Sequence, residues 1–159
     1  MNPLLIIMLL GAGVFYLTQS SDAPEKDILR CSIKVISLDS LKFDGKLSNT
    51  LRLSIGIDNP TKYYFSIIQV NVKLSYNDSE VSNSSTASAT IPLKAKERTL
   101  VSNVQIGVPY TSDLSVDSLF EKNHNKEWKL EVSTTIKGTE IKSTKTYKIT
   151  DLLNLKIIK

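Results

Sequence analysis

Residues 50–76 read TLRLSIGIDNPTKYYFSIIQVNVKLSY, and this stretch decides the fold. In residues 50–58 apolar side chains alternate with polar or small ones, a period of two that predicts a strand with one buried face. Residues 68–76 alternate in the same way and predict a second strand. Asn59 and Pro60 end the first strand, because proline lacks a backbone donor and keeps the preceding residue out of the helical region.

The rest of the chain after residue 27 follows the same pattern. The period of two predicts five more strands, at residues 31–38, 87–93, 99–108, 128–137 and 140–149. Residues that accept a positive φ predict antiparallel hairpins at three turns, Asp44-Gly45, Asn77-Asp78-Ser79 and Lys137-Gly138-Thr139. Apolar residues spaced i, i+3, i+4 predict one helix, at residues 112–122.

Strands and helices do not alternate along this chain, so nothing builds the crossovers of a parallel sheet. We therefore predict an all-β domain at residues 28–150, a seven-stranded antiparallel β-sandwich like immunoglobulin and fibronectin-III domains, with one short helix. Residues 22–27 form a polar linker before it. Residues 151–159, DLLNLKIIK, add an edge strand or dock as a tail.

The N-terminal segment differs in composition from the rest of the chain. The chain of 159 residues carries 20 Lys and Arg and 16 Asp and Glu, yet none of them precedes Asp22. We expect residues 1–21 to be a transmembrane helix that anchors the protein, because only a helix satisfies its own backbone inside lipid. The side chains assigned to this anchor are Leu4, Leu5, Ile6, Ile7, Leu9, Leu10, Val14, Phe15 and Leu17.

The apolar run, residues 4–17, is short for a membrane span, since at about 1.5 Å per residue it reaches roughly 21 Å of a core of about 30 Å. A cleaved signal peptide and a helix buried in a protein assembly therefore remain alternatives. The near absence of positive charge before the run favours a soluble domain on the extracytoplasmic side.

Reactive groups are scarce in this sequence. The only histidine, His124, lies in a polar stretch, and the only cysteine, Cys31, begins a predicted strand and is expected in the core. No motif of a hydrolase or a metal site accompanies them, and Asp78 and Glu80 are better explained by a hairpin turn than by calcium binding. We predict no enzyme, no catalytic residues, no cofactor and no metal.

The net charge of +4 is concentrated near the C-terminus. Lys142, Lys145 and Lys148 recur among Ser and Thr, which predicts a basic face that attracts anionic lipid or an acidic protein. The alternative is a charged edge that resists aggregation. Nucleic acid is not expected as a partner, because the chain has few arginines and no aromatic residues among these lysines.

Three aromatic residues follow the Asn-Pro step, at Tyr63, Tyr64 and Phe65. They are a candidate contact surface, although we expect at least two of the rings to be buried.

The run LRLSIGIDNPTKYYFSIIQVNVKLSYNDSEVSNSS, residues 51–85, resembles the late embryogenesis abundant (LEA) type 2 family, also called the WHy domain. The residues that match its motif are Asp58, Asn59 and Pro60, and Thr61 stands where a second Asn is common. The resemblance implies a seven-stranded sandwich with one helix and no catalytic residues. Such domains occur in stress-protective proteins and, with an N-terminal membrane segment, in membrane-anchored plant relatives.

These features together predict a non-enzymatic, membrane-anchored β-sandwich that acts as a structural, scaffolding or protective interaction module near a bilayer. Its expected partners are membrane lipid and another protein. The alternative is a minor structural protein of a membrane-containing virion, anchored in the viral membrane and touching the capsid.

Overall fold

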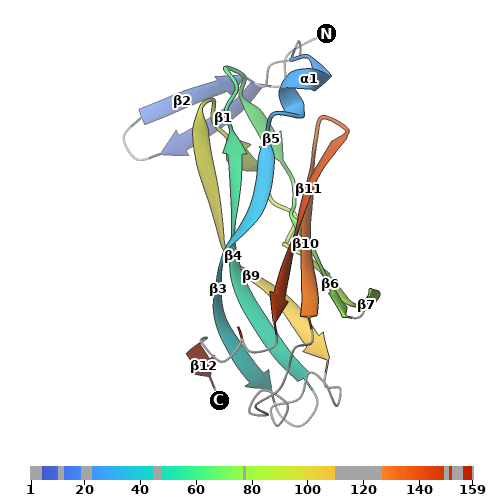
Figure 1. The fold of residues 1–159 in the computed structure, drawn as a ribbon. Helices are drawn as coiled ribbons and strands as arrows, with labels where there is room; N and C mark the ends of the chain where they lie inside the picture. Colours follow the sequence, from blue (N-terminus) through green and yellow to red (C-terminus); the bar gives the residue numbers. More distant parts are fainter. Residues whose placement is uncertain are drawn as a thin grey trace.

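Two four-stranded sheets pack face to face in the computed structural model (Figure 1). The structure describes residues 5–10, 13–18, 23–44, 48–76, 78–109, 127–148, 151 and 156–158. The first sheet has the order β12–β3–β4–β9, formed by Lys156–Ile158, Ser32–Asp44, Ser48–Asn59 and Glu97–Pro109. The second has the order β11–β10–β6–β7, formed by Thr139–Lys148, Glu127–Ile136, Asn71–Tyr76 and Ser79–Ser85. The predicted sandwich is confirmed at this level.

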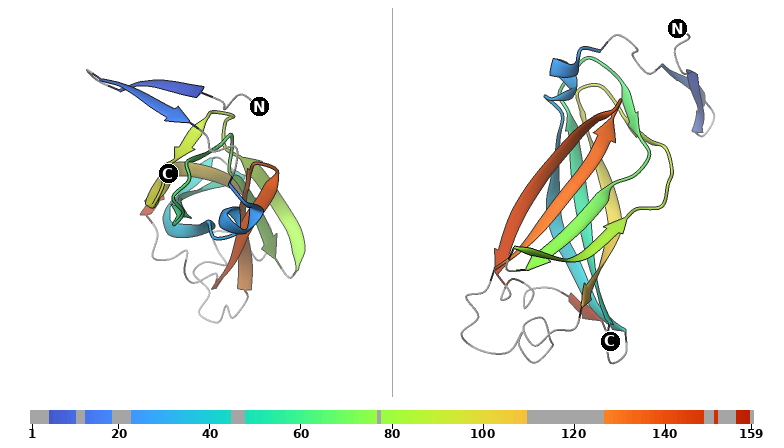
Figure 2. Two further views of the ribbon diagram at one scale, coloured as in Figure 1. Left: turned by 90° about the horizontal axis from the view of Figure 1, so that it is seen from above. Right: turned by 90° about the vertical axis from the view of Figure 1, so that its right-hand side faces the viewer.

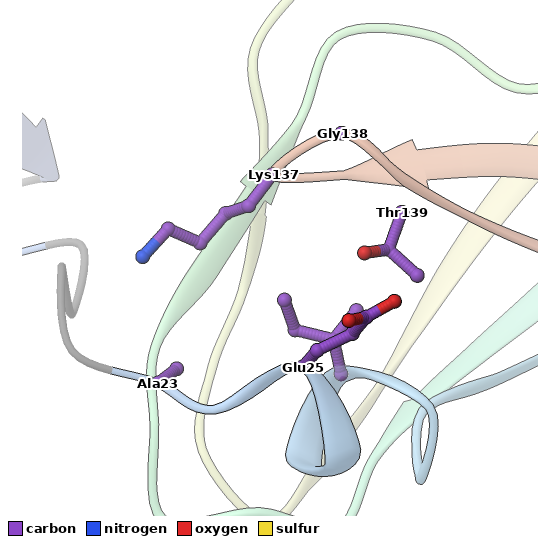
Figure 3. A pocket seen from close by; sticks show the side chains of 6 residues that line it. Ala23, Glu25, Lys137, Gly138 and Thr139 are labelled. Atoms are coloured by element: carbon purple, nitrogen blue, oxygen red, sulfur yellow. The ribbon is translucent and has the colours of Figure 1, made fainter.

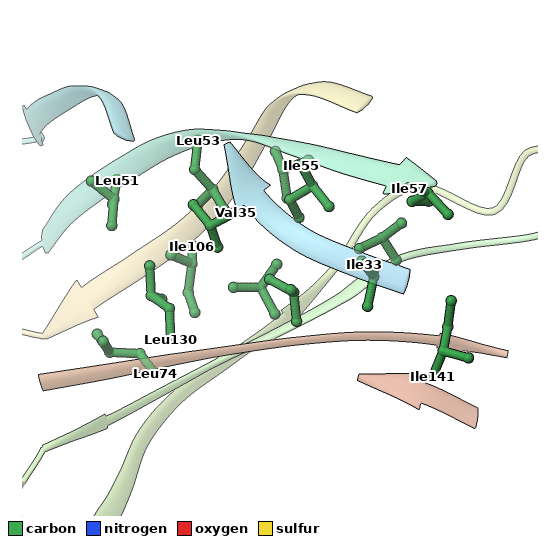
Figure 4. Close-up of a cluster of buried hydrophobic side chains, with 14 of the residues drawn as sticks. Ile33, Val35, Leu51, Leu53, Ile55, Ile57, Leu74, Ile106, Leu130 and Ile141 are labelled. Atoms are coloured by element: carbon green, nitrogen blue, oxygen red, sulfur yellow. The ribbon is translucent and has the colours of Figure 1, made fainter. Parts of the chain in front are cut away.

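The core lies between the sheets and follows from the period of two. On β4 the four alternating apolar residues are fully buried, namely Leu51, Leu53, Ile55 and Ile57. Leu74 of β6 and Leu130 of β10 face them from the second sheet (Figure 4). Full burial of such a side chain contributes about 1.5–3 kcal/mol, so this interleaved layer is the main stabilising element of the fold.

The turn between β10 and β11 is the two-residue hairpin that the sequence predicts. Lys137 and Gly138 both have positive φ, 48° and 82°, as a type I′ turn requires. The ladder then runs without a break from the pair Ile136 and Thr139 to the pair Glu127 and Lys148. This uninterrupted register fixes which β11 side chains share a face.

Strand β3 contains two irregularities that the alternation in residues 31–38 does not predict. Its register against β4 shifts between Val35 and Ser37 and again between Leu38 and Ser40. The first shift leaves Ile36 on the outer face, 40% exposed, above Gly56 of β4. Leu100 of β9, which pairs with Gly56, is 57% exposed. The outer face of this sheet therefore carries a small apolar patch.

Three strands and a helix differ from the expectation. Strand β7 was not predicted because SEVSNSS lacks alternation, and the predicted strand at 87–93 is reduced to β8, Ile91–Leu93, paired with a short β5, Phe65–Ile67. Helix α1, Glu25–Ile28, lies at the predicted linker and buries Ile28 at one end of the core. The predicted helix at 112–122 and His124 lie outside the described residues.

The C-terminal tail adds an edge strand, but a parallel one. Residues 156–158 form β12, in which Lys156 pairs with Ser40 and Ile158 with Lys42 of β3. The first sheet is therefore mixed at this edge, while the other pairs in the two four-stranded sheets are antiparallel, as predicted. Strand β12 does not follow β3 directly along the chain, so no tight turn between them requires an antiparallel direction.

The described residues of the N-terminal segment are strands, and the predicted transmembrane helix is not seen among them. Leu5–Leu10 (β1) and Gly13–Thr18 (β2) form an antiparallel hairpin, in register from Leu5 with Thr18 to Leu10 with Gly13. Two glycines lower the helix propensity, and the β-branched and aromatic residues favour strands. Eight of the nine assigned anchor residues lie on these strands, and Leu4 is outside the described residues.

The hairpin projects from the end of the sandwich that carries α1, as both side views show (Figures 1 and 2). Among the described residues, no helix has the length and apolar character needed to cross a membrane.

Candidate functional site

Asn59 is the polar centre of the sandwich end that carries α1. It ends β4, is 1% exposed, and its Nδ2 donates to the carbonyl oxygens of Tyr63, Leu93 and Lys94 at 2.8, 3.1 and 3.2 Å. An amide nitrogen has two hydrogens, so one of them is shared between two acceptors. Because Pro60 stops the ladder at this point, the side chain replaces backbone pairing and joins two segments 34 residues apart.

The side-chain oxygen of Asn59 is satisfied as well. Its Oδ1 accepts from the backbone N–H and the hydroxyl of Thr61, at 3.2 and 2.7 Å, and from the Cys31 thiol at 3.6 Å. Thr61 is 2% exposed, and its hydroxyl accepts from the Tyr63 N–H at 3.2 Å. Every polar atom of the Asn59 side chain is thus used inside the protein, which is a structural role.

Cys31 belongs to this network rather than to a reactive site. Its side chain is buried, and burial is the main cause that raises its thiol pKa, with Arg30 lowering it and Asp27 raising it. A protonated thiol is a weak donor, which fits the contact with the Asn59 oxygen.

Asp58, the neighbour of Asn59 in the motif, points to the outer face instead. Arg98 binds its carboxylate with two hydrogen bonds, Nε to Oδ1 at 2.6 Å and Nη2 to Oδ2 at 3.1 Å, and Lys34 Nζ lies 3.8 Å from Oδ2. The hydrogen bond from Arg98 is the main cause that lowers the Asp58 pKa below its usual value. The motif therefore combines an exposed ion pair with a buried amide.

The Asn59 network positions two loops that carry lysines. The loop after β4 holds Lys62, and the turn between β8 and β9 holds Lys94 and Lys96, all exposed. The Lys96 N–H donates to the Thr61 carbonyl at 3.0 Å, so the two loops are joined directly as well as through Asn59. We call Lys62, Lys94 and Lys96 the loop lysines. Lys62 is far in sequence from the other two, and these long-range hydrogen bonds bring their loops together.

The aromatic triplet is not an exposed contact surface. Phe65 is fully buried and Tyr64 is 8% exposed, while Tyr63 is half-buried with Lys62 Nζ 5.4 Å from its ring centre. Burial raises the pKa of Tyr64, whose hydroxyl has no hydrogen-bond partner in the described structure. Phe65 begins β5 and belongs to the core cluster, and Tyr64 directly before it is buried as well.

The predicted basic face on β11 does not form either. Lys142 and Lys148 lie on the outer face, but Lys145 is an odd number of residues away from both and lies on the opposite one, with its Nζ 5.1 Å from the Tyr147 ring. In register, Lys148 stands opposite Glu127 and Lys142 opposite Ser133. The prediction grouped these lysines by composition, whereas the period of two separates them.

Acidic and basic side chains instead alternate over the outer face of the second sheet. Lys129 binds Asp78 at 2.7 Å and Lys73 binds Glu80 at 3.3 Å. A shallow hollow of about 270 Å³ lies beside them, lined by Asn71, Lys73, Asn83, Ser85, Glu131 and Ser133. This face is polar and close to charge balance.

A second hollow, of about 380 Å³, lies between the start of α1 and the β10–β11 turn (Figure 3). Ala23, Glu25, Ile28, Lys137, Gly138 and Thr139 line it. It offers one carboxylate, on Glu25, and one ammonium group, on Lys137. Within the part of the chain that the structure describes, no three His, Cys, Asp or Glu side chains are grouped as metal ligands.

No family model matches this chain, and no curated protein matches it. Among solved structures, the solution structure of AT1g01470 from Arabidopsis thaliana is similar with a TM-score of 0.51 and 20% identity, over 73% of this chain and 78% of that one. At this identity the likeness shows a shared sandwich fold and nothing of function.

Two weaker similarities are of different kinds. A protein described as a late embryogenesis abundant (LEA) protein, At2g46140.1, has a TM-score of 0.40 and 16% identity, over 78% of this chain and 74% of that one. A β-glucuronidase from glycoside hydrolase family 2 has a TM-score of 0.49 and 10% identity, and the match spans 73% of this chain but 11% of the enzyme. Neither says what this chain does.

Proposed function

We propose that this protein is a non-catalytic β-sandwich, similar to LEA type 2 domains, which its apolar N-terminal segment holds at a membrane and which presents a surface to a partner there. One observation carries the proposal. An uncharged apolar segment joins, through a few residues, a sandwich whose motif residues are used for internal hydrogen bonds.

The Asn59 network supports the non-catalytic part. A catalytic group needs a free donor, acceptor or nucleophile at a solvent-accessible position. Asn59, Thr61 and Cys31 instead satisfy one another and two backbone segments in a buried cluster. The polar groups of the motif thus serve to shape the end of the fold.

The composition and the connection support the tether. From Thr18 to Ala23 the chain has five residue steps, which reach at most about 18 Å when fully extended. The apolar segment therefore stays close to the end of the sandwich that carries α1. As the helix that lipid requires of a single segment, its burial would be favourable by roughly 25 cal/mol for each Å² of apolar surface.

Membrane extraction of the full chain tests the tether. We expect the wild-type protein to remain with membranes after alkaline carbonate, and the double variant Leu9→Lys, Val14→Lys to enter the soluble fraction. Charges in an apolar segment oppose insertion strongly. The matched control Ser21→Lys adds a charge just outside the segment and is expected to stay membrane-bound. Wild-type protein in the soluble fraction would contradict the tether.

Crosslinking in the native membrane tests the interaction role. Lysine-reactive crosslinkers on the wild-type protein are expected to give discrete products with a partner protein, and the soluble double variant is expected to lose them. Unchanged products from the soluble variant would show that the interaction does not need the membrane.

A further inference from the structure

The loop lysines differ from the basic side chains that pair with carboxylates on the faces of the two sheets. Lys73, Lys129 and Arg98 each have a carboxylate within 3.3 Å. Lys62, Lys94 and Lys96 are exposed and form no ion pair within the described ranges. Their ammonium groups are therefore available to an external anion.

The backbone beneath these lysines is held in place. Asn59 donates to carbonyl groups of both loops, and the Lys96 N–H closes them together. Lys96 also has a φ of 58°, a conformation that a residue other than glycine adopts only where the surroundings impose it. The three positive charges thus project from one fixed platform rather than from independent loops.

The end that carries this platform is basic overall. Its described basic residues are Lys26, Arg30, Lys34, Lys62, Lys94, Lys96, Arg98 and Lys137, and its acidic residues are Glu25, Asp27, Asp58, Glu97 and Glu140. Asp27 is paired with Arg30 at 3.5 Å. The acidic residues lie on α1, at the end of β4 and at the starts of β9 and β11, so none is within the two loops that Asn59 holds. Asp58 is already bound by Arg98 and Lys34.

The same end has an apolar side chain in solvent and the apolar hairpin. Leu29, which follows α1, is 61% exposed. Strands β1 and β2 project from this end (Figures 1 and 2). An exposed leucine at the same end as a group of lysines suits binding to the surface of an anionic bilayer, because the leucine can enter the interface while the lysines contact head groups.

We propose that the α1 end of the sandwich lies against an anionic membrane surface, with Lys62, Lys94 and Lys96 on the lipid head groups and Leu29 in the interface. This inference rests on the proposed tether, since the apolar segment brings this end to the bilayer. The loop lysines thus take the role of the basic membrane contact that the sequence had assigned to the lysines of β11.

Vesicle binding by the full chain separates the two proposals. Neutral phosphatidylcholine vesicles measure the apolar segment alone, and vesicles that also contain phosphatidylserine add the contribution of the lysines. Each lysine near an anionic surface strengthens binding about 5-fold, so we expect the triple variant Lys62→Gln, Lys94→Gln, Lys96→Gln to lose on the order of 100-fold on anionic vesicles. Binding to neutral vesicles should not change.

The matched control is Lys142→Gln, Lys145→Gln, Lys148→Gln, which removes the same charge from β11. We expect this control to keep most of the stronger binding to anionic vesicles. We expect added salt to weaken wild-type binding to these vesicles until it approaches that of the triple variant of the loop lysines. Equal losses in the two variants would overturn the inference, because then only net charge matters. Failure of the wild type to bind neutral vesicles would instead contradict the tether, and the anionic comparison would still decide the inference.

A second pair of variants tests the leucine. Leu29→Ser and Leu100→Ser change side chains of similar exposure, 61% and 57%, and Leu100 lies on the outer face of β9. We expect Leu29→Ser alone to weaken binding to anionic vesicles, by several-fold. Unfolding curves that match the wild type show that both variants are folded. Equal binding by the two variants would place the membrane contact elsewhere.

Discussion

The α1 end and the outer face of the second sheet use polar side chains in opposite ways. At the α1 end, Asn59 and Thr61 are almost fully buried and bind backbone groups of segments distant in sequence. On the outer face, Lys129 and Asp78 bind each other in solvent, with side-chain exposures of 46% and 84%. Buried polar groups without partners are costly, whereas exposed ion pairs contribute little. The first region therefore fixes loop geometry, and the second keeps the sheet soluble.

Removal of the Asn59 amide should give the largest effect. In Asn59→Ala, the carbonyl groups of Tyr63, Leu93 and Lys94 lose their shared donor inside a buried site. We expect the free energy of unfolding to fall by roughly 3 kcal/mol or more, because several buried groups remain unsatisfied. Chemical denaturation monitored by Trp128 fluorescence measures the change.

The matched control is Asn71→Ala on the outer face. Asn71 is half-buried, and its Oδ1 accepts from Ser85 Oγ at 2.7 Å beside an open polar hollow. Water can replace that bond, so we expect a loss below about 1 kcal/mol. Similar losses in Asn59→Ala and Asn71→Ala would mean that the two regions do not differ as the structure suggests.

Thr61→Val should give an intermediate effect. Valine keeps the volume of the side chain but removes the hydroxyl that donates to Asn59 Oδ1 at 2.7 Å and accepts from the Tyr63 N–H. We expect a loss of about 1–2 kcal/mol, the cost of leaving such partners unpaired. Thr146→Val, on an exposed position of β11, is the control and should be close to neutral. A neutral Thr61→Val would show that Asn59 alone holds the loops.

The sequence predicts strands correctly where apolar and polar residues alternate and one face of the strand is buried. The strands predicted at 50–58, 128–137 and 140–149 correspond to β4, β10 and β11, which are Ser48–Asn59, Glu127–Ile136 and Thr139–Lys148, and Lys137-Gly138 forms the expected turn. The polar strand β7 and the four-residue helix α1 carry no such pattern, because neither buries a regular face of its own. The apolar segment at residues 4–17 satisfies the requirements of both a helix and a hairpin, so hydrophobicity alone does not choose between them.

The candidate surface was harder to predict than the fold. Asn59 and Pro60 were recognised as a structural motif, but the partners Leu93 and Lys94 are 34 and 35 residues away, and no local pattern reveals them. The lysines of β11 looked like a cluster because charge was counted along the chain. Parity in the strand places Lys145 on the other face, and this could have been read from the alternation with Ile141 and Tyr147.

Asp58→Asn should have a smaller effect that depends on pH. The hydrogen bond from Arg98 holds the Asp58 pKa below its ordinary value near 3.8, so the folded state favours the charged carboxylate. This stabilisation is fully present above that ordinary value and is lost as pH falls through the lower pKa of the folded protein. We expect Asp58→Asn to be less stable at neutral pH, with the difference vanishing in acid. Thermal unfolding of both proteins across acidic pH measures it, and a difference that persists below the folded pKa would point to lost packing instead.

Lys129→Gln should give the smallest effect on stability and sharpens the contrast with Asn59. The pair with Asp78 is exposed on both sides, and its hydrogen bond is the main cause that lowers the Asp78 pKa. Because solvent screens such a pair, we expect no measurable change in Tm, while the Asp78 pKa moves up toward its ordinary value in an NMR titration. A shifted pKa without a shifted Tm shows that a short, well-formed contact need not hold the fold. If Lys129→Gln lowered Tm as much as Thr61→Val, the outer face would be part of the framework that positions the loops, and the division between the two regions would fail.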